Sequence, residues 1–206
     1  IDRLTVSDAQ GVWLEARNVH MDWSYWPLLG RRFHAKDISA DVIRLIRQPV
    51  LEPDTGQPGG PQPVSIAIDR FSTHVELMEG FSKEYGRWAL SGRADIPRSG
   101  VKSAVVDADS LNRPGDFLRL NASFGGKLED TRLNLRANEA QGGPLAGSLG
   151  YSPDQPFSAV AVLNDEIVHA RVQTGRFTPL TIEGRFGKNG SRVSGFADFS
   201  GSELLA

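Results

Sequence analysis

Residues that could carry out catalysis or bind a metal are few and scattered in this chain of 206 residues. The four histidines, His20, His34, His74 and His169, are far apart, and none has the spacing of a zinc-binding motif. The chain has no cysteine, which excludes thiolate catalysis, a disulfide scaffold and any Cys-based metal site. We therefore predict no metal site and interpret the histidines as surface residues.

Carboxylates and glycines supply the remaining candidates for chemistry. Asp107-Ala108-Asp109 has the acidic character of a calcium loop, but the other ligands and the loop glycine are missing, which favours a solvated acidic edge. The sequence has no nucleophile elbow or phosphate-binding loop, and the glycines of residues 142–147, with no helix expected after them, are interpreted as turn residues. The sequence therefore predicts a protein that is not an enzyme, with no catalytic residue and no cofactor.

Charge and hydropathy limit the partners. Lys and Arg total 23 against 25 Asp and Glu, so the net charge of −2 gives no general reason to bind nucleic acid or an anionic membrane surface. The net charge does not exclude a local basic patch. No apolar stretch of about 18 residues occurs, so no transmembrane helix is expected within the chain. Because it begins at Ile1 inside a strand-like run, we interpret the chain as a piece of a longer polypeptide whose membrane anchor lies elsewhere.

Alternation of apolar and polar residues runs through the second half of the chain and predicts β-strands. Leu133, Leu135 and Ala137, for example, alternate with arginine and asparagine, so one face of that strand is apolar and the other polar. Turn residues such as Asn189-Gly190 separate the segments and favour hairpins. Nine apolar positions form the candidate lining of a hydrophobic groove: Leu90, Leu118, Leu120, Leu133, Leu135, Val168, Val172, Leu180 and Ile182.

A segment rich in proline and glycine divides the chain. Residues 1–47 are predicted to be a β segment with a β-bulge near Arg17-Asn18, where the alternation slips by one. The longest helix of the chain is expected to be a short turn near Trp26–Gly30 in this segment. Residues 48–63 hold five of the twelve prolines and are predicted to be an exposed, mobile loop, with an interdomain linker as the alternative. Residues 64–206 are predicted to continue the same sheet as an antiparallel meander.

These patterns together predict an all-β fold, an antiparallel meander that curls into an elongated groove, with a β-sandwich as the alternative. A sheet of about a dozen strands rarely stays flat and open, and curling would join its apolar faces into one surface. No second apolar sheet is evident to cover that surface, so an acyl chain could occupy the groove. Trp13, Trp23 and Trp26 are interpreted as covering an open end of the β core, with an aromatic binding platform as the alternative.

A further pattern lies in the first fifty residues. Ser7-Asp8-x-x-Gly11 is followed by Trp13-Leu14 and then by Val19-x-Met21-Asp22-Trp23. A Leu28-Leu29 turn, an Ile38-Ser39-Ala40 strand and Arg47-Gln48-Pro49 complete the unit, and Val64 to Phe71 follows the proline-rich loop. This order resembles the amino-terminal periplasmic region of the TamB family, AsmA-like subunits of the translocation and assembly module. Met21 stands where the family usually has leucine, and Tyr25-Trp26-Pro27 lengthens the turn.

The resemblance covers about the first two thirds of the chain and weakens after Gly150. It implies a β-taco, a long sheet folded along its length around a hydrophobic inside, in the periplasmic portion of a bacterial protein anchored in the inner membrane. It also implies transport of phospholipid between the membranes, with acyl chains as ligands, and help in outer-membrane protein assembly beside a TamA-like partner. Two other classes stay open: a scaffold or chaperone-like module that pairs its edge strands with partner proteins, and a sandwich that binds an unrelated ligand.

Overall fold

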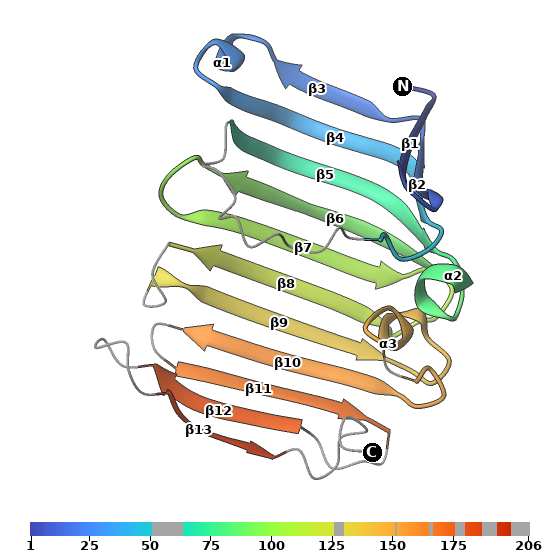
Figure 1. Cartoon of the computed structure of the whole chain (residues 1–206). Coiled ribbons are helices and arrows are strands. Elements are labelled where there is room, and N and C mark those ends of the chain that lie inside the picture. Colours follow the sequence, from blue (N-terminus) through green and yellow to red (C-terminus); the bar gives the residue numbers. More distant parts are fainter. Residues whose placement is uncertain are drawn as a thin grey trace.

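A single large β-sheet with three short helices makes up the fold, which is known from a computed structural model (Figure 1). The structure describes residues 1–50, 64–125, 130–150, 152–164, 167–175, 180–186 and 193–198. The strands, in chain order, are β1 (Arg3–Asp8), β2 (Gly11–Arg17), β3 (His20–Ser24), β4 (Arg32–Leu45), β5 (Ser65–Leu77), β6 (Gly86–Ile96), β7 (Lys102–Ser110), β8 (Phe117–Phe124), β9 (Arg132–Glu139), β10 (Phe157–Asn164), β11 (Ile167–Thr174), β12 (Leu180–Phe186) and β13 (Val193–Asp198). The predicted all-β character is confirmed.

From β5 to β13 each strand pairs antiparallel with the next, as the alternating segments and turns predict. The loop that contains Asn189-Gly190 lies outside the described residues, although β12 and β13 on either side of it pair antiparallel. The described strands form one open sheet, so the two sheets of the alternative, a sandwich, are not found among them. Whether the sheet curls into a β-taco stays a prediction.

The antiparallel prediction is wrong at one place, because β4 and β5 are parallel. Parallel neighbours need a connection that returns along the whole strand. The 14 residues of β4 extend about 46 Å at about 3.3 Å per residue, and residues 46–64, fully extended, can reach about 60 Å. The proline-rich segment is therefore long enough to be this crossover. The mobile loop was expected over residues 48–63, and residues 51–63 lie outside the described part of the chain.

The slip in alternation near Arg17-Asn18 is a break between two strands, so the predicted bulge is wrong there. Asn18 has a φ of 49°, a left-handed conformation that asparagine adopts more readily than most residues. Its amide donates to Asp2 O at 3.0 Å, and the Val19 amide donates to Ile1 O at 2.8 Å. Beyond this break, β2 pairs with the carboxyl-terminal end of β4 and β3 pairs with its amino-terminal half.

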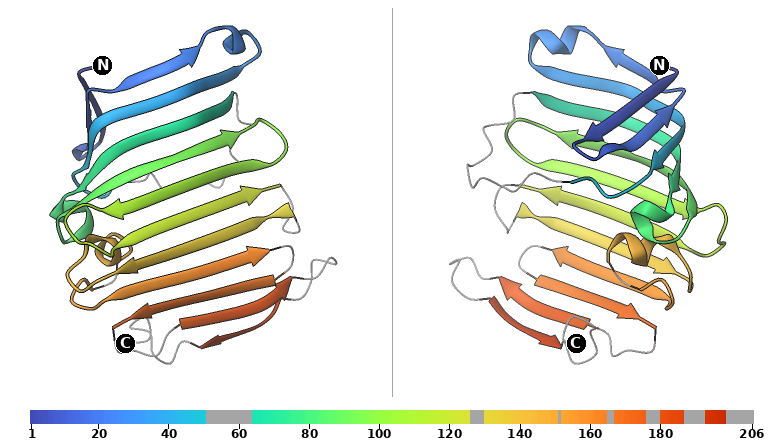
Figure 2. Two further views of the ribbon diagram at one scale, coloured as in Figure 1. Left: turned by 180° about the vertical axis from the view of Figure 1, so that it is seen from behind. Right: turned by 45° about the vertical axis from the view of Figure 1, so that its right-hand side comes forward.

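The three helices are α1 (Trp26–Leu29), α2 (Glu79–Ser82) and α3 (Pro144–Ser148). The position of α1 confirms the predicted turn. The prediction that this is the longest helix is wrong, because α3 is one residue longer, and α3 overlaps residues 142–147, whose glycines were expected to form turns. Helix α1 precedes β4, whereas α2 follows β5 and α3 follows β9. Figures 1 and 2 show α1 at one end of the strands and the α2–α3 pair at the other.

Candidate functional site

The strand register brings the predicted groove residues to one side of the sheet. Partners directly opposite each other in a ladder share a face, and every second residue returns to it. One row of partners crosses six strands, β6 to β11, and consists of Leu90, Ala108, Leu118, Ala137, Ala159 and Val172. We call the side of the sheet that carries this row the apolar face.

Two further rows cross five of these strands, β7 to β11, on the apolar face. One consists of Val106, Leu120, Leu135, Ala161 and Ala170, and the other of Ala104, Ala122, Leu133, Leu163 and Val168. Leu180 and Ile182 on β12 are the register partners of Val172 and Ala170, which extends two of the rows by one strand at the backbone level. The nine residues predicted from the sequence therefore belong to three adjacent rows of one sheet.

The α2–α3 pair covers one end of the apolar face. Phe81 of α2 and Leu145 of α3 pack against a buried cluster of Val75, Leu77, Trp88 and Ala108. Leu145 also contacts a second cluster, formed by Ala137, Ala146, Phe157 and Ala159. Three predicted groove residues, Leu90, Leu118 and Val172, pack at this covered end.

Four other predicted groove residues belong to neither cluster. They are Leu120, Leu133, Leu135 and Val168, and all four are half-buried. Ala104, Val106, Ala161 and Leu163, which surround them in the register, are also half-buried. We call this region the open part of the apolar face. It is a contiguous apolar surface on which neither helical cluster packs.

A buried carboxylate holds α3 in place over the sheet. Glu139, at the end of β9, is only 2 % exposed, and its two carboxylate oxygens accept hydrogen bonds from the amides of Leu145 at 2.6 Å and Ala146 at 2.7 Å. These amides have no partner within the helix, so Glu139 satisfies them. Burial raises the pKa of Glu139, and the two amide hydrogen bonds oppose that rise.

Close backbone contact joins α2 to α3. A Cβ atom at Gly147 would overlap Ser82 O, so only glycine allows this approach. Gln48 reinforces the pair, since its side-chain Nε2 donates to Phe81 O at 2.8 Å and to Ser148 O at 3.4 Å. The two helices therefore act as one cover. Neither helix could be predicted from periodicity, because each is only about one turn long.

The opposite side of the sheet is polar and carries ion pairs between neighbouring strands. Arg119 on β8 contacts Asp107 at 3.4 Å and Asp109 at 2.5 Å, so the supposed calcium-loop acids lie on β7 beside an arginine. Arg44 and Glu76 pair at 2.6 Å. Among the described residues, no group of three or more acidic or histidine side chains has the arrangement needed to hold a metal ion.

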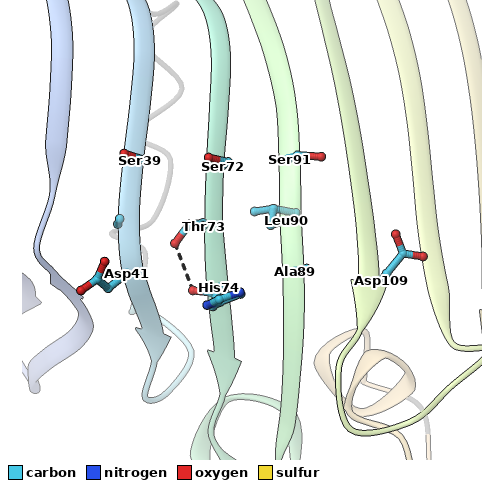
Figure 3. A pocket seen from close by; sticks show the side chains of 10 residues that line it. Ser39, Asp41, Ser72, Thr73, His74, Ala89, Leu90, Ser91 and Asp109 are labelled. Carbon is cyan, nitrogen blue, oxygen red and sulfur yellow. Dashed lines mark hydrogen bonds between the residues drawn. The ribbon is translucent and has the colours of Figure 1, made fainter.

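The sheet also has a shallow hollow of about 550 Å³ over β4 to β7, and its lining includes Leu90, one of the predicted groove residues (Figure 3). Its lining consists of Ser39, Ala40, Asp41, Ser72, Thr73, His74, Ala89, Leu90, Ser91 and Asp109. Both carboxylates already have partners, because Asp41 accepts a hydrogen bond from Asn18 at 2.7 Å and Asp109 pairs with Arg119. What remains is a set of hydroxyls and one imidazole on an open surface, without a convergent charge that would define a ligand.

The three clustered tryptophans do not behave alike. Trp13 and Trp23 are half-buried, and the Trp23 ring lies 4.4 Å from the Tyr25 ring and 5.9 Å from the Phe33 ring, centroid to centroid. Trp26 is 83 % exposed, so its interpretation as cover for a β core is wrong. The reason is local, since α1 buries none of its residues.

Comparisons of the chain with protein-family models, with curated proteins and with solved structures found no match. Within the described part of the chain, no helix has the length and hydropathy needed to cross a bilayer.

Proposed function

We propose that this chain is a non-enzymatic, periplasmic segment of a TamB-like bridge protein. Its apolar face would carry phospholipid acyl chains between the inner and outer membranes, in support of outer-membrane biogenesis and protein assembly. The inner-membrane anchor and a TamA-like outer-membrane partner belong to the same proposal. The motif order of the first fifty residues supports the family assignment, and the apolar face supports the ligand.

The observation that carries the proposal is the open part of the apolar face. A half-buried leucine still exposes apolar surface to water, and Leu120, Leu133 and Leu135 do so side by side on two strands. Soluble proteins rarely leave such a patch without a partner. Each methylene of an acyl chain that moves from water onto this surface contributes up to about 0.8 kcal/mol.

The dimensions of the face also suit an acyl chain. Neighbouring strands lie about 4.8 Å apart, so the longest of the three apolar rows crosses about 24 Å from β6 to β11. One leaflet of a bilayer is about half of the 30 Å hydrocarbon core, or roughly 15 Å. An extended acyl chain therefore fits across these strands, and small residues such as Ala104, Ala122 and Ala161 leave room above the backbone.

Bound phospholipid in the purified chain, measured before and after one charge substitution, tests the proposal. We expect native mass spectrometry of the purified chain to show bound phospholipid, and Leu135→Asp to abolish that adduct because a carboxylate among acyl chains loses its hydration. Asn134→Asp is the matched control: it adds the same charge at the neighbouring residue, which is exposed on the polar side. A wild-type chain free of lipid, or equal adducts in both variants, would refute the proposal.

The open sheet edges favour a second candidate, a scaffold that pairs with partner proteins. Among the described residues, β13 pairs only with β12 and β3 only with β4, so each has a side free for another strand. Edge pairing uses backbone groups and not the apolar face. Leu135→Asp would therefore leave the binding of a partner strand unchanged while it removes lipid.

A further inference from the structure

Helix α1 points apolar side chains into solvent at one corner of the molecule. Tyr25 is 71 % exposed, Trp26 83 % and Leu29 82 %, and Leu28 is 41 % exposed. We call these four residues, together with Arg31 and Arg32, the α1 patch. Trp26 and Leu29 protrude too far to gain stability from packing, which indicates that their partner is not among the described residues.

The backbone beneath the α1 patch is fixed even though its side chains are not buried. The Leu28 amide donates to Tyr25 O at 3.1 Å, and the Arg31 amide donates to Leu28 O at 2.9 Å. Arg31 O in turn accepts from the Ser65 amide at 2.9 Å, which ties the turn to β5. The Tyr25 ring rests against Trp23. The protruding side chains are therefore held by a rigid support, which lowers the entropy cost of binding.

The charges beside α1 select the kind of partner. Arg31 and Arg32 are exposed, and neither guanidinium has an ion pair with a described residue. The neighbouring acid Asp37 is already held by Arg70 at 2.6 Å, and Lys36 adds another exposed positive charge. A membrane surface has two layers, phosphate headgroups above apolar tails. The protruding aromatic and leucine side chains match the apolar layer, and the unpaired arginines match the phosphates.

We propose that the α1 patch inserts into the surface of a lipid bilayer that contains anionic phospholipid. Trp26 and Leu29 enter the boundary between headgroups and acyl chains, and Arg31 and Arg32 contact the phosphates. A protein partner fits less well, because a standard interface covers about 800 Å² on each side and one helical turn is far smaller. The position of α1 at the end of the strands opposite α2 and α3 leaves it free to approach a membrane (Figure 2). This inference does not depend on lipid carriage by the apolar face.

Sedimentation with vesicles tests the inference on the intact chain. We expect binding to phosphatidylcholine vesicles that contain about one third phosphatidylglycerol, weakened at least about tenfold by Trp26→Ser with Leu29→Ser. Arg31→Gln with Arg32→Gln should weaken that binding by about fivefold for each arginine and have little effect on pure phosphatidylcholine vesicles. All of these side chains are exposed, so unchanged thermal unfolding should confirm that the variants fold.

Two controls make the result specific. Leu149→Ser removes an apolar residue that is 59 % exposed at the other end of the molecule, and it should bind vesicles like the wild type. Leu135→Asp should also bind, which separates membrane contact from lipid carriage. Absence of vesicle binding in the wild type, or equal losses from Leu149→Ser and the α1 variants, would overturn the inference.

Discussion

Asp8 ties the β1–β2 turn to the end of β4. Its carboxylate pairs with Arg47 and accepts hydrogen bonds from the amides of Gln10 and Val50, both at 2.8 Å. Arg47 also donates to Gly11 O at 2.7 Å. The arginine and the two amides hold the pKa of Asp8 well below its usual range.

The low pKa of Asp8 makes its stabilising effect depend on pH. A depressed pKa in the folded state contributes stability above the unfolded value of 3.8, and that contribution is lost as the pH falls through the folded pKa. We expect Asp8→Asn to lower the free energy of unfolding at about pH 6, with a difference from the wild type that shrinks as the pH approaches about 2. Urea titrations at several pH values measure this, and a difference independent of pH would contradict it.

Glu139 has the opposite dependence on pH. Its raised pKa means that its contribution to stability is fully present below the unfolded value of 4.5 and is lost as the pH rises through the folded pKa. Glu139→Ala leaves the amides of Leu145 and Ala146 without partners and is expected to cost about 1 to 3 kcal/mol. Hydrogen exchange at those two amides should accelerate in the variant. Unchanged exchange there would show that Glu139 does not hold α3.

Strand β8 passes from the covered end of the apolar face to its open part within two residues. Leu118 packs against both buried clusters, whereas Leu120 belongs to neither. We expect Leu118→Ala to cost about 2 to 3 kcal/mol and Leu120→Ala about 1 kcal/mol, because an open site leaves no closed cavity. Denaturant unfolding of the two variants checks the order. Equal losses would mean that another part of the protein covers the open part.

Individual elements could be predicted to different degrees. The Trp26-Pro27-Leu28-Leu29 turn is predictable, and the structure places its proline in the first turn of α1, where proline is favoured. Helices α2 and α3 were missed, since about one turn carries no periodicity, although Gly143-Pro144 has the same proline signal. The parallel pairing of β4 and β5 was missed because alternation gives the faces of a strand and not the direction of its neighbour.

For the molecule as a whole, the set of apolar residues that share one side of the sheet was the most predictable feature. A period of two places Leu118 and Leu120, or Leu133 and Leu135, on one side of any strand, so the nine candidates fall into common rows once the hairpins form. What covers that side depends on contacts distant in sequence, such as Leu145 of α3 against the buried cluster that contains Trp88 and Ala108. The sequence therefore predicted the apolar face and not its division into a covered end and an open part.

The proposed lipid transport requires acyl chains to occupy the open part of the apolar face. A photo-crosslinking amino acid at Leu120 or Leu135, and in the controls at the polar-side neighbours Asn121 or Asn134, tests this in cells that produce the full-length protein. We expect phospholipid adducts, identified by mass spectrometry, at the two leucine positions and not at the two asparagine positions. Adducts in equal yield on both sides, or none at Leu120 and Leu135, would contradict the proposed lipid path.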